Sequence, residues 1–267
     1  MTPLSSSIHL NCMMKTEYLN NLIEQWTALG ASFGSRPWLG MIDIERLLLD
    51  TARHSPFQSR LFIMAATWLH AYGDLVAKHR LKRLICEELE DEHRPTIGLL
   101  LDIAQQGTHP LEFQSIIRHL EPNDCPHPLY NISRKNDRLA LRAEKRASRI
   151  SKRWGLWCEP FDLKHDALRP ASWMIRSHPE LRTRADFRGD LRASILAALR
   201  CDPGAGHSEL RLARLAGGSR AQVRNALNNL QMTNRVRCEP AAGANRIEIS
   251  LPEREYELIG QCAARIH

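Results

Sequence analysis

A short segment near the C-terminal end, GGSRAQVRNALNNL, constrains the fold of this 267-residue chain more than any other. Ser219 followed three positions later by Gln222 is the pattern of a capping box, in which each side chain bonds to the backbone amide of the other residue where a helix begins. Gly217 and Gly218 allow the chain to leave a preceding helix in a left-handed conformation. The segment therefore predicts a tight turn and then a helix with a sharply defined first residue.

The predicted helix has an apolar side and a polar side. At about 100° per residue, the apolar side collects Val223, Ala226, Leu227 and Leu230. The opposite side carries Ala221, Arg224, Asn225 and Asn228, with Arg220 beside them. Arginine can bridge O6 and N7 of guanine, and asparagine can pair with N6 and N7 of adenine. Because a recognition helix places its base-reading residues in its first turns, we expect the polar side to contact DNA.

The residues around this helix indicate a unit with a definite order of elements. Two helices are predicted before it, over 186–201 and 208–217, with Ser208 as the candidate N-cap of the second. Two further runs, 235–240 and 246–251, flank a turn that follows it. In the last run Ile247, Ile249 and Leu251 alternate with polar residues, which is typical of a half-buried strand. The predicted order is helix, helix, helix, strand, strand.

Residues 188–252 resemble the winged helix-turn-helix domain of bacterial transcription regulators. The positions that match the family pattern are Leu210, Ala213, Leu215, Gly217, Ser219, Val223, Leu227 and Leu230. The chain departs from the pattern at Asn234, where the family usually has glycine before the first wing strand, although asparagine also adopts the left-handed conformation. A larger N-terminal region before such a unit is also similar in architecture to antitoxins and regulators from phage-defence loci.

This resemblance implies that residues 219–231 form a recognition helix in the major groove of double-stranded DNA, with the wing, 236–251, on the DNA backbone. The DNA-binding residues that it implies are Ser208, Ser219, Arg220, Gln222, Arg224, Asn225, Asn228, Arg235 and Arg246. Because two half-sites multiply the affinity of such regulators, we expect a homodimer. The alternative is a wing that binds a partner protein, with a polar helix side that is simply solvated.

The charge distribution favours a polyanionic partner for the back half of the chain. The net charge is +7, yet residues 1–130 carry 11 basic and 15 acidic side chains, residues 131–180 carry 12 and 6, and residues 181–267 carry 14 and 9. After Lys164 every basic residue is an arginine, whose planar fork suits phosphates and guanine edges. We therefore expect nucleic acid to meet the C-terminal region.

A separate basic stretch, residues 134–153, holds nine basic and two acidic side chains. Two interpretations stay open for it. One is a solvated surface or a linker. The other is a strip along DNA phosphates, which adds salt-sensitive affinity but no specificity. In the second interpretation the phosphate contacts come from Arg142, Lys145, Arg149 and Arg153.

The expected fold class is mainly α, with an N-terminal helical bundle and a C-terminal winged helix-turn-helix that has a two-stranded β wing. The first 120 residues show helical periodicity, with a break near Gly73, and no useful alternation of period two. The expected division is a helical dimerisation or effector domain at 1–125, a basic and Pro/Trp-rich connector at 126–184, the winged helix-turn-helix at 185–255 and a tail at 256–267.

One motif raises the possibility of an enzyme. Gly34 and Ser35 precede Asp43 and Glu45, and nucleotidyltransferases have a Gly-Ser turn before two metal-holding carboxylates. The seven residues between Ser35 and Asp43 are fewer than that family uses, and residues 41–50 have a helical rather than a strand pattern. Acidic residues in the first turn of a helix explain the same letters, because the helix dipole favours them.

The sequence predicts no cofactor, no metal site and no contact with a membrane. Seven scattered cysteines without a CxxC pair indicate reduced thiols, and the N-terminal residues lack a secretory pattern. We therefore expect a cytoplasmic, nucleoid-associated and non-enzymatic DNA-binding transcription regulator, acting as a repressor or autoregulator. The alternatives are an antitoxin or other interaction protein whose helical domain binds a toxin or defence component, and a nucleotidyltransferase-like enzyme.

Overall fold

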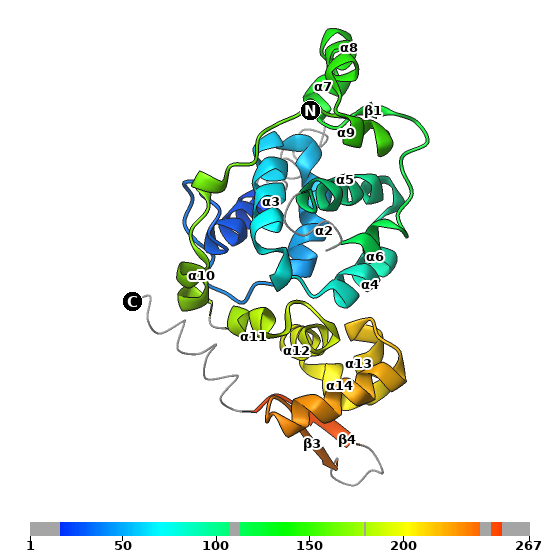
Figure 1. The fold of residues 1–267 in the computed structure, drawn as a ribbon. Helices are drawn as coiled ribbons and strands as arrows, with labels where there is room; N and C mark the ends of the chain where they lie inside the picture. The colour runs from blue at the N-terminus through cyan, green and yellow to red at the C-terminus, as the bar shows by residue number, and fades with distance from the viewer. Residues whose placement is uncertain (1–16, 107–112, 179, 241–246, 253–267) are drawn as a thin grey trace, which may run out of the picture.

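The computed structural model describes residues 17–106, 113–178, 180–240 and 247–252. These residues are mainly helical, with a small two-stranded antiparallel sheet near the C-terminal end, as the sequence predicts (Figure 1). Among them, no helix combines the length and the apolar character that crossing a bilayer requires. The buried apolar residues form two clusters, a larger one within residues 22–181 and a smaller one within residues 195–251.

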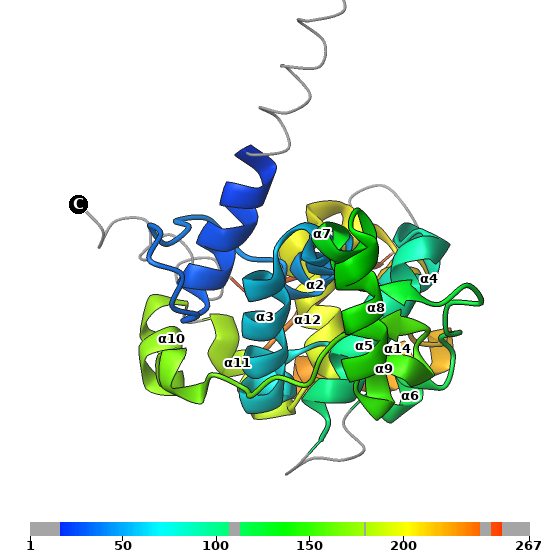
Figure 2. The ribbon, with the colours of Figure 1, turned by 90° about the horizontal axis from the view of Figure 1, so that it is seen from above.

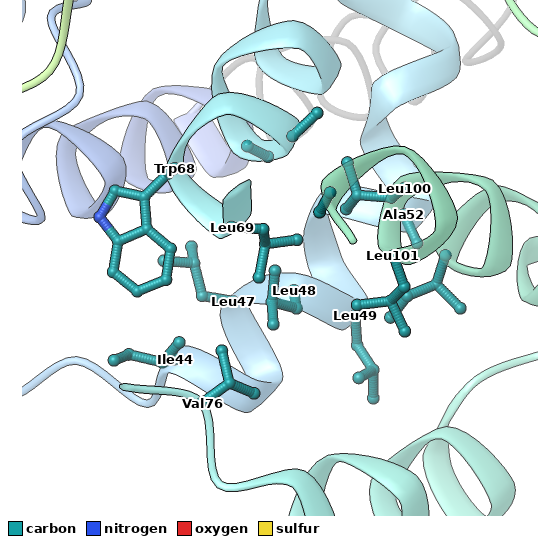
Figure 3. Packing of buried hydrophobic residues seen from close by; sticks show 14 of the residues in the cluster. Ile44, Leu47, Leu48, Leu49, Ala52, Trp68, Leu69, Val76, Leu100 and Leu101 are labelled. Atoms are coloured by element: carbon teal, nitrogen blue, oxygen red, sulfur yellow. The ribbon is translucent and has the colours of Figure 1, made fainter. Parts of the chain in front are cut away.

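The larger cluster is enclosed by the helices of the first 120 residues. These are the helical residues 17–28, α2 (Ile44–His54), α3 (Ser59–Tyr72), α4 (Lys78–Glu88), α5 (Arg94–Ala104) and α6 (Gln114–Ile117). Figure 3 shows Leu47 and Leu48 of α2 beside Leu69 of α3. Trp26 and Trp68 pack edge to face, with ring centroids 5.5 Å apart. Both side chains are fully buried and fill the centre of the larger cluster.

Helix ends in this region follow local sequence signals. Asp43 is the N-cap of α2 and accepts a hydrogen bond from the backbone N of Arg46 at 3.3 Å. The predicted break near Gly73 is confirmed, because α3 ends at Tyr72 and a 3-10 turn, Gly73–Leu75, leads toward α4. Pro95 lies in the first turn of α5, where its missing N–H has no partner to lose.

The middle part of the chain packs onto the larger cluster. It contains β1 (His127–Pro128), α7 (Asn131–Arg134), α8 (Asp137–Arg146), α9 (Arg149–Arg153), β2 (Leu156–Trp157) and α10 (Ala171–Ser177). β1 and β2 pair in parallel. Trp154 is buried in the cluster and donates its indole N–H to Asp102 of α5 at 2.9 Å. This bond fixes the α7–α9 segment on the N-terminal helices.

The C-terminal unit has its own core. After α11 (Glu180–Phe187), it contains α12 (Leu191–Cys201), a 3-10 turn (Pro203–His207), α13 (Glu209–Ala216), α14 (Arg220–Met232), β3 (Arg237–Pro240) and β4 (Ile247–Ser250). β3 and β4 are antiparallel, with Cys238 opposite Ile249. Ile249, Val236 and the apolar side of α14 close the smaller cluster over α12 and α13. The strands therefore belong to the same folding unit as the three helices.

The C-terminal unit is docked on α4. Gly217 ends α13 with a left-handed φ of 81°, and a Cβ atom there would lie 2.2 Å from the carbonyl oxygen of His79. A Cβ atom at Gly189, which has φ 70°, would lie 2.0 Å from the carbonyl oxygen of Val76, just before α4, and the Gly189 carbonyl accepts from the backbone N of Lys78 at 3.3 Å. Glycine is required at both positions, because each backbone is left-handed and leaves no room for a Cβ atom beside the neighbouring carbonyl oxygen. The turn that precedes α14 is consequently held against the N-terminal helices.

Candidate nucleic-acid interface

The predicted capping box at the start of α14 is confirmed. The backbone N of Gln222 donates to Ser219 Oγ at 3.3 Å, and the backbone N of Ser219 donates to Gln222 Oε1 at 3.0 Å. Two backbone amides that the helix itself leaves without partners are thereby satisfied. This local device, together with the left-handed Gly217, explains why α14 begins at one definite residue.

The two sides of α14 lie as its periodicity predicts. Val223, Leu227 and Leu230 are buried in the smaller cluster, while Ala226 is half-buried at its edge. The exposed residues of its polar side are Arg220, Ala221, Gln222, Arg224, Asn225 and Asn228. The first two turns therefore offer guanidinium and amide groups to the solvent, while the apolar side packs the helix onto the smaller cluster.

The arginines of α14 are turned toward the start of α13. Arg224 donates to both carboxylate oxygens of Glu209, with Nε at 3.2 Å and Nη2 at 2.7 Å. Arg220 Nη2 lies 3.9 Å from the same carboxylate. The hydrogen bond and the charge of Arg224 lower the pKa of Glu209. Because this pair is exposed, solvent screens it, and a guanine edge or a phosphate can replace the carboxylate as partner.

The remaining predicted DNA contacts have mixed positions. Ser208 caps α13 and accepts from the backbone N of Arg211 at 3.1 Å. Arg235 is half-buried, with Nη2 3.2 Å from Asp186. Asn234 adopts the left-handed conformation, with φ 54°, which matches the role expected at the departure from the family pattern. Arg246 lies outside the described residues.

The second predicted basic surface lies at the other end of the molecule. Figure 1 places α8 at the top and α14 at the bottom, with the N-terminal helices between them. Figure 2 looks down this direction, and α8, α9 and α14 project over the same area of the view. All four predicted phosphate contacts are exposed there, and two of them have carboxylate partners: Arg142 pairs with Glu159 at 3.0 Å, and Arg153 pairs with Asp102. These four residues do not extend the surface of α14.

The two carboxylates of the enzyme hypothesis are enclosed by arginines. Glu45 is fully buried and accepts from Arg80 at 2.8 Å, from Arg184 at 2.5 and 3.0 Å, and from the backbone N of Ala77 at 2.8 Å. Asp43 accepts from Arg80 at 2.5 and 2.6 Å. Burial raises the pKa of Asp43, but the hydrogen bonds and charge of Arg80 outweigh it and leave that pKa lowered. The two carboxylates offer no open pair to a metal ion.

Sequence reasoning missed this network, since Arg184 lies on α11 and 139 positions from Glu45. No pattern of spacing could have joined the two residues. Over the described part of the chain, no group of three or more His, Cys, Asp or Glu side chains is placed to hold a metal ion. Comparison with protein-family models, with curated proteins and with solved structures gave no match.

Proposed function

We propose that this chain is a sequence-specific duplex-DNA-binding transcription regulator in which α14 enters the major groove. The observation that carries the proposal is the composition of the first two turns of α14, where Arg220, Gln222, Arg224 and Asn225 are all exposed. Arginine and asparagine supply the bidentate donors and acceptors that distinguish guanine and adenine in that groove. A 13-residue helix is about 20 Å long, enough to contact several successive base pairs.

The strands beside α14 support a second contact, to the DNA backbone. β3 and β4 form an antiparallel pair next to the helix, and Arg237 on β3 is exposed. In a winged helix-turn-helix such a hairpin lies against the sugar-phosphate chain, where it positions the domain without reading sequence. The net positive charge of residues 181–267 adds a long-range attraction to the same partner.

The regulatory outcome that we propose is repression or autoregulation by a homodimer, acting in the cytoplasm on the nucleoid. A dimer places two copies of α14 on half-sites one helical turn apart. Binding near a promoter would then exclude the polymerase. Nothing in this mechanism needs a catalytic residue or a cofactor.

A gel-shift titration against the DNA upstream of the protein's own gene, with a random duplex as competitor, tests the proposal. Arg224→Ala is expected to reduce the preference for the specific duplex by about tenfold or more, because a bidentate base contact is lost, while random-duplex affinity is largely kept. Asn225→Ala should act in the same direction. Arg142→Ala, the same type of change on α8, serves as the control. Unchanged specificity in both α14 variants would overturn the assignment.

A further inference from the structure

A basic groove lies beside the contact between α4 and the α13–α14 turn. It has a volume of about 640 Å³ and lies between the N-terminal helices and the C-terminal unit. Its walls come mainly from α4, from the residues before α12, and from the end of α13. The basic side chains that line it are Lys78, His79, Lys82, Arg83, Arg188 and Arg214. The described lining residues thus bring cations from both units to one concave surface.

The acidic side chains of the groove already have partners. Glu87 pairs with Arg83 at 2.5 Å. Asp190 caps α12 through the backbone N of Arg192 at 2.8 Å and also pairs with the guanidinium of that arginine at 2.6 Å. Among the described residues, neither carboxylate pairs with Lys82 or Arg214. The positive charges of these two side chains are therefore available to a ligand in the groove.

Several of the cations have donor capacity left for a ligand. Lys82 Nζ lies 3.0 Å from His119 Nε2. This contact uses one of the three N–H donors of the lysine and leaves two for a ligand. Arg214 is exposed and makes no ion pair with any described residue. Arg83 donates Nε to the carbonyl oxygen of Leu215 at 3.1 Å, across the seam. Burial lowers the pKa of Arg83, and the attraction of Glu87 does not make up for it. An anion beside these donors would accept charge-assisted hydrogen bonds from them.

We propose that this groove binds a phosphate-bearing anion, held by Lys82 from α4 and Arg214 from α13. Lysine and arginine are the usual partners of phosphate, and they form charge-assisted hydrogen bonds with it. A volume of about 640 Å³ lies in the range of small-molecule sites. The phosphate can belong to a free phosphorylated compound or to a DNA backbone that passes the turn before α14. The recognition chemistry is the same for both.

A bound phosphate would connect the two units of the molecule. It would contact α4, which belongs to the larger cluster, and α13, which belongs to the smaller one. Any ligand that binds only the docked arrangement stabilises it by mass action. The free-phosphate form of the proposal is independent of base reading by α14, because it involves no DNA.

Isothermal titration of the full chain with inorganic pyrophosphate, at constant ionic strength, tests the site. The test variant is Lys82→Gln with Arg214→Gln. The control variant is Arg36→Gln with Lys164→Gln, which removes the same charges from two exposed residues that do not line the groove. We expect the test variant to bind pyrophosphate about tenfold more weakly, since two charge-assisted bonds are lost, and the control variant to match the unmodified chain.

A second titration with a random-sequence duplex distinguishes the two sources of phosphate. If pyrophosphate does not bind but the test variant alone lowers duplex affinity and its salt dependence, the groove takes backbone phosphate, and the proposal stands in that form. Equal pyrophosphate and duplex affinities in the unmodified chain, the test variant and the control variant would overturn it. Sequence preference measured on α14 variants remains a separate result, so the failure of one proposal is not the failure of the other.

Discussion

Arginine–carboxylate pairs occur in two opposite settings in this molecule. Between α2, α4 and α11, Glu45 is sealed from solvent and shared by Arg80 and Arg184. At the surface, the half-buried Glu209 at the start of α13 binds the exposed Arg224 of α14. The chemical groups are the same, and burial alone separates them. A buried pair is part of the architecture, because no water can replace either partner, whereas an exposed pair can exchange its carboxylate for another anion.

The buried pair also explains how the C-terminal unit is attached to the N-terminal helices. Arg184 belongs to α11, which leads into α12, and it also donates to the carbonyl oxygen of Leu75 at 3.1 Å. Each charged side chain of this buried network therefore has a partner from another segment. On α14, Arg224 also has a partner from another helix, Glu209 of α13, but this pair lies at the surface, where solvent and ligands compete for it. One region fixes where the C-terminal unit lies, and the other holds donors that a ligand can take over.

The largest effect is expected from Glu45→Ala. This change leaves the buried guanidinium of Arg184 without a carboxylate and leaves Arg80 with Asp43 alone, which costs about 3–5 kcal/mol of the free energy of unfolding. Urea denaturation followed by circular dichroism measures it. The matched change in the exposed pair, Glu209→Ala, should leave the unfolding midpoint nearly unchanged. Equal destabilisation by the two variants would show that burial does not separate the pairs.

A smaller effect is expected from Gly217→Ala, which tests the docking of the turn on α4. The left-handed backbone and the contact with the carbonyl of His79 together predict a loss of about 1–3 kcal/mol. Gly34→Ala is the control, since Gly34 has a similar φ of 78° but nothing within 4 Å of its added Cβ. The excess loss at Gly217, measured by thermal unfolding, reports the close approach alone. If Gly217→Ala loses no more stability than Gly34→Ala, the contact between the turn and α4 adjusts to the added methyl group without a loss of free energy.

Local signals in the sequence predicted the local structure well. The capping box of Ser219, the left-handed Asn234, the break at Gly73 and the apolar seam of α14 each depend on residues within one or two helical turns. Their physical causes, namely capping, backbone sterics and periodic burial, are visible in a short segment.

Long-range partners could not be predicted in this way. Asp43 and Glu45 suggested metal ligands from their spacing, but Arg80 and Arg184 reach them from 35 and 139 positions beyond Glu45. The sequence leaves a phosphate strip open for the basic stretch at 134–153, but it gives no sign that this stretch lies at the end of the molecule away from α14, where the bond between Trp154 and Asp102 holds it. Folding decides which charges meet, and charge counts along the chain do not contain that information.

An intermediate local effect is expected from Ser219→Ala. Loss of the cap should cost about 1 kcal/mol and let the first turn of α14 fray, which weakens specific DNA binding in the same gel-shift assay. Asn136→Ala removes the N-cap of α8, where Asn136 accepts from the backbone N of Leu139 at 3.1 Å. The control variant should lose similar stability and keep DNA affinity. If both variants bind DNA with equal affinity, an ordered first turn of α14 is not needed for recognition.

The smallest effect is expected from Glu209→Gln, and it tests the exchangeable pair directly. The change removes the carboxylate that holds Arg224. It also removes a negative charge beside the helix that we propose to enter the DNA. Duplex affinity should rise by about threefold at low salt and by less at higher salt, because exposed charges are screened.

Glu144→Gln provides the same loss of charge on the exposed surface of α8, away from the proposed interface, and should leave duplex affinity unchanged. Both variants change the net charge equally, so a difference between their duplex affinities at two salt concentrations reports the local effect at Glu209. If Glu209→Gln instead weakens specific binding, the carboxylate orients Arg224 for its base rather than competing with it. The exposed pair would then have a fixed structural role, as the buried pair of Glu45 has, and the contrast between the two regions would be one of degree.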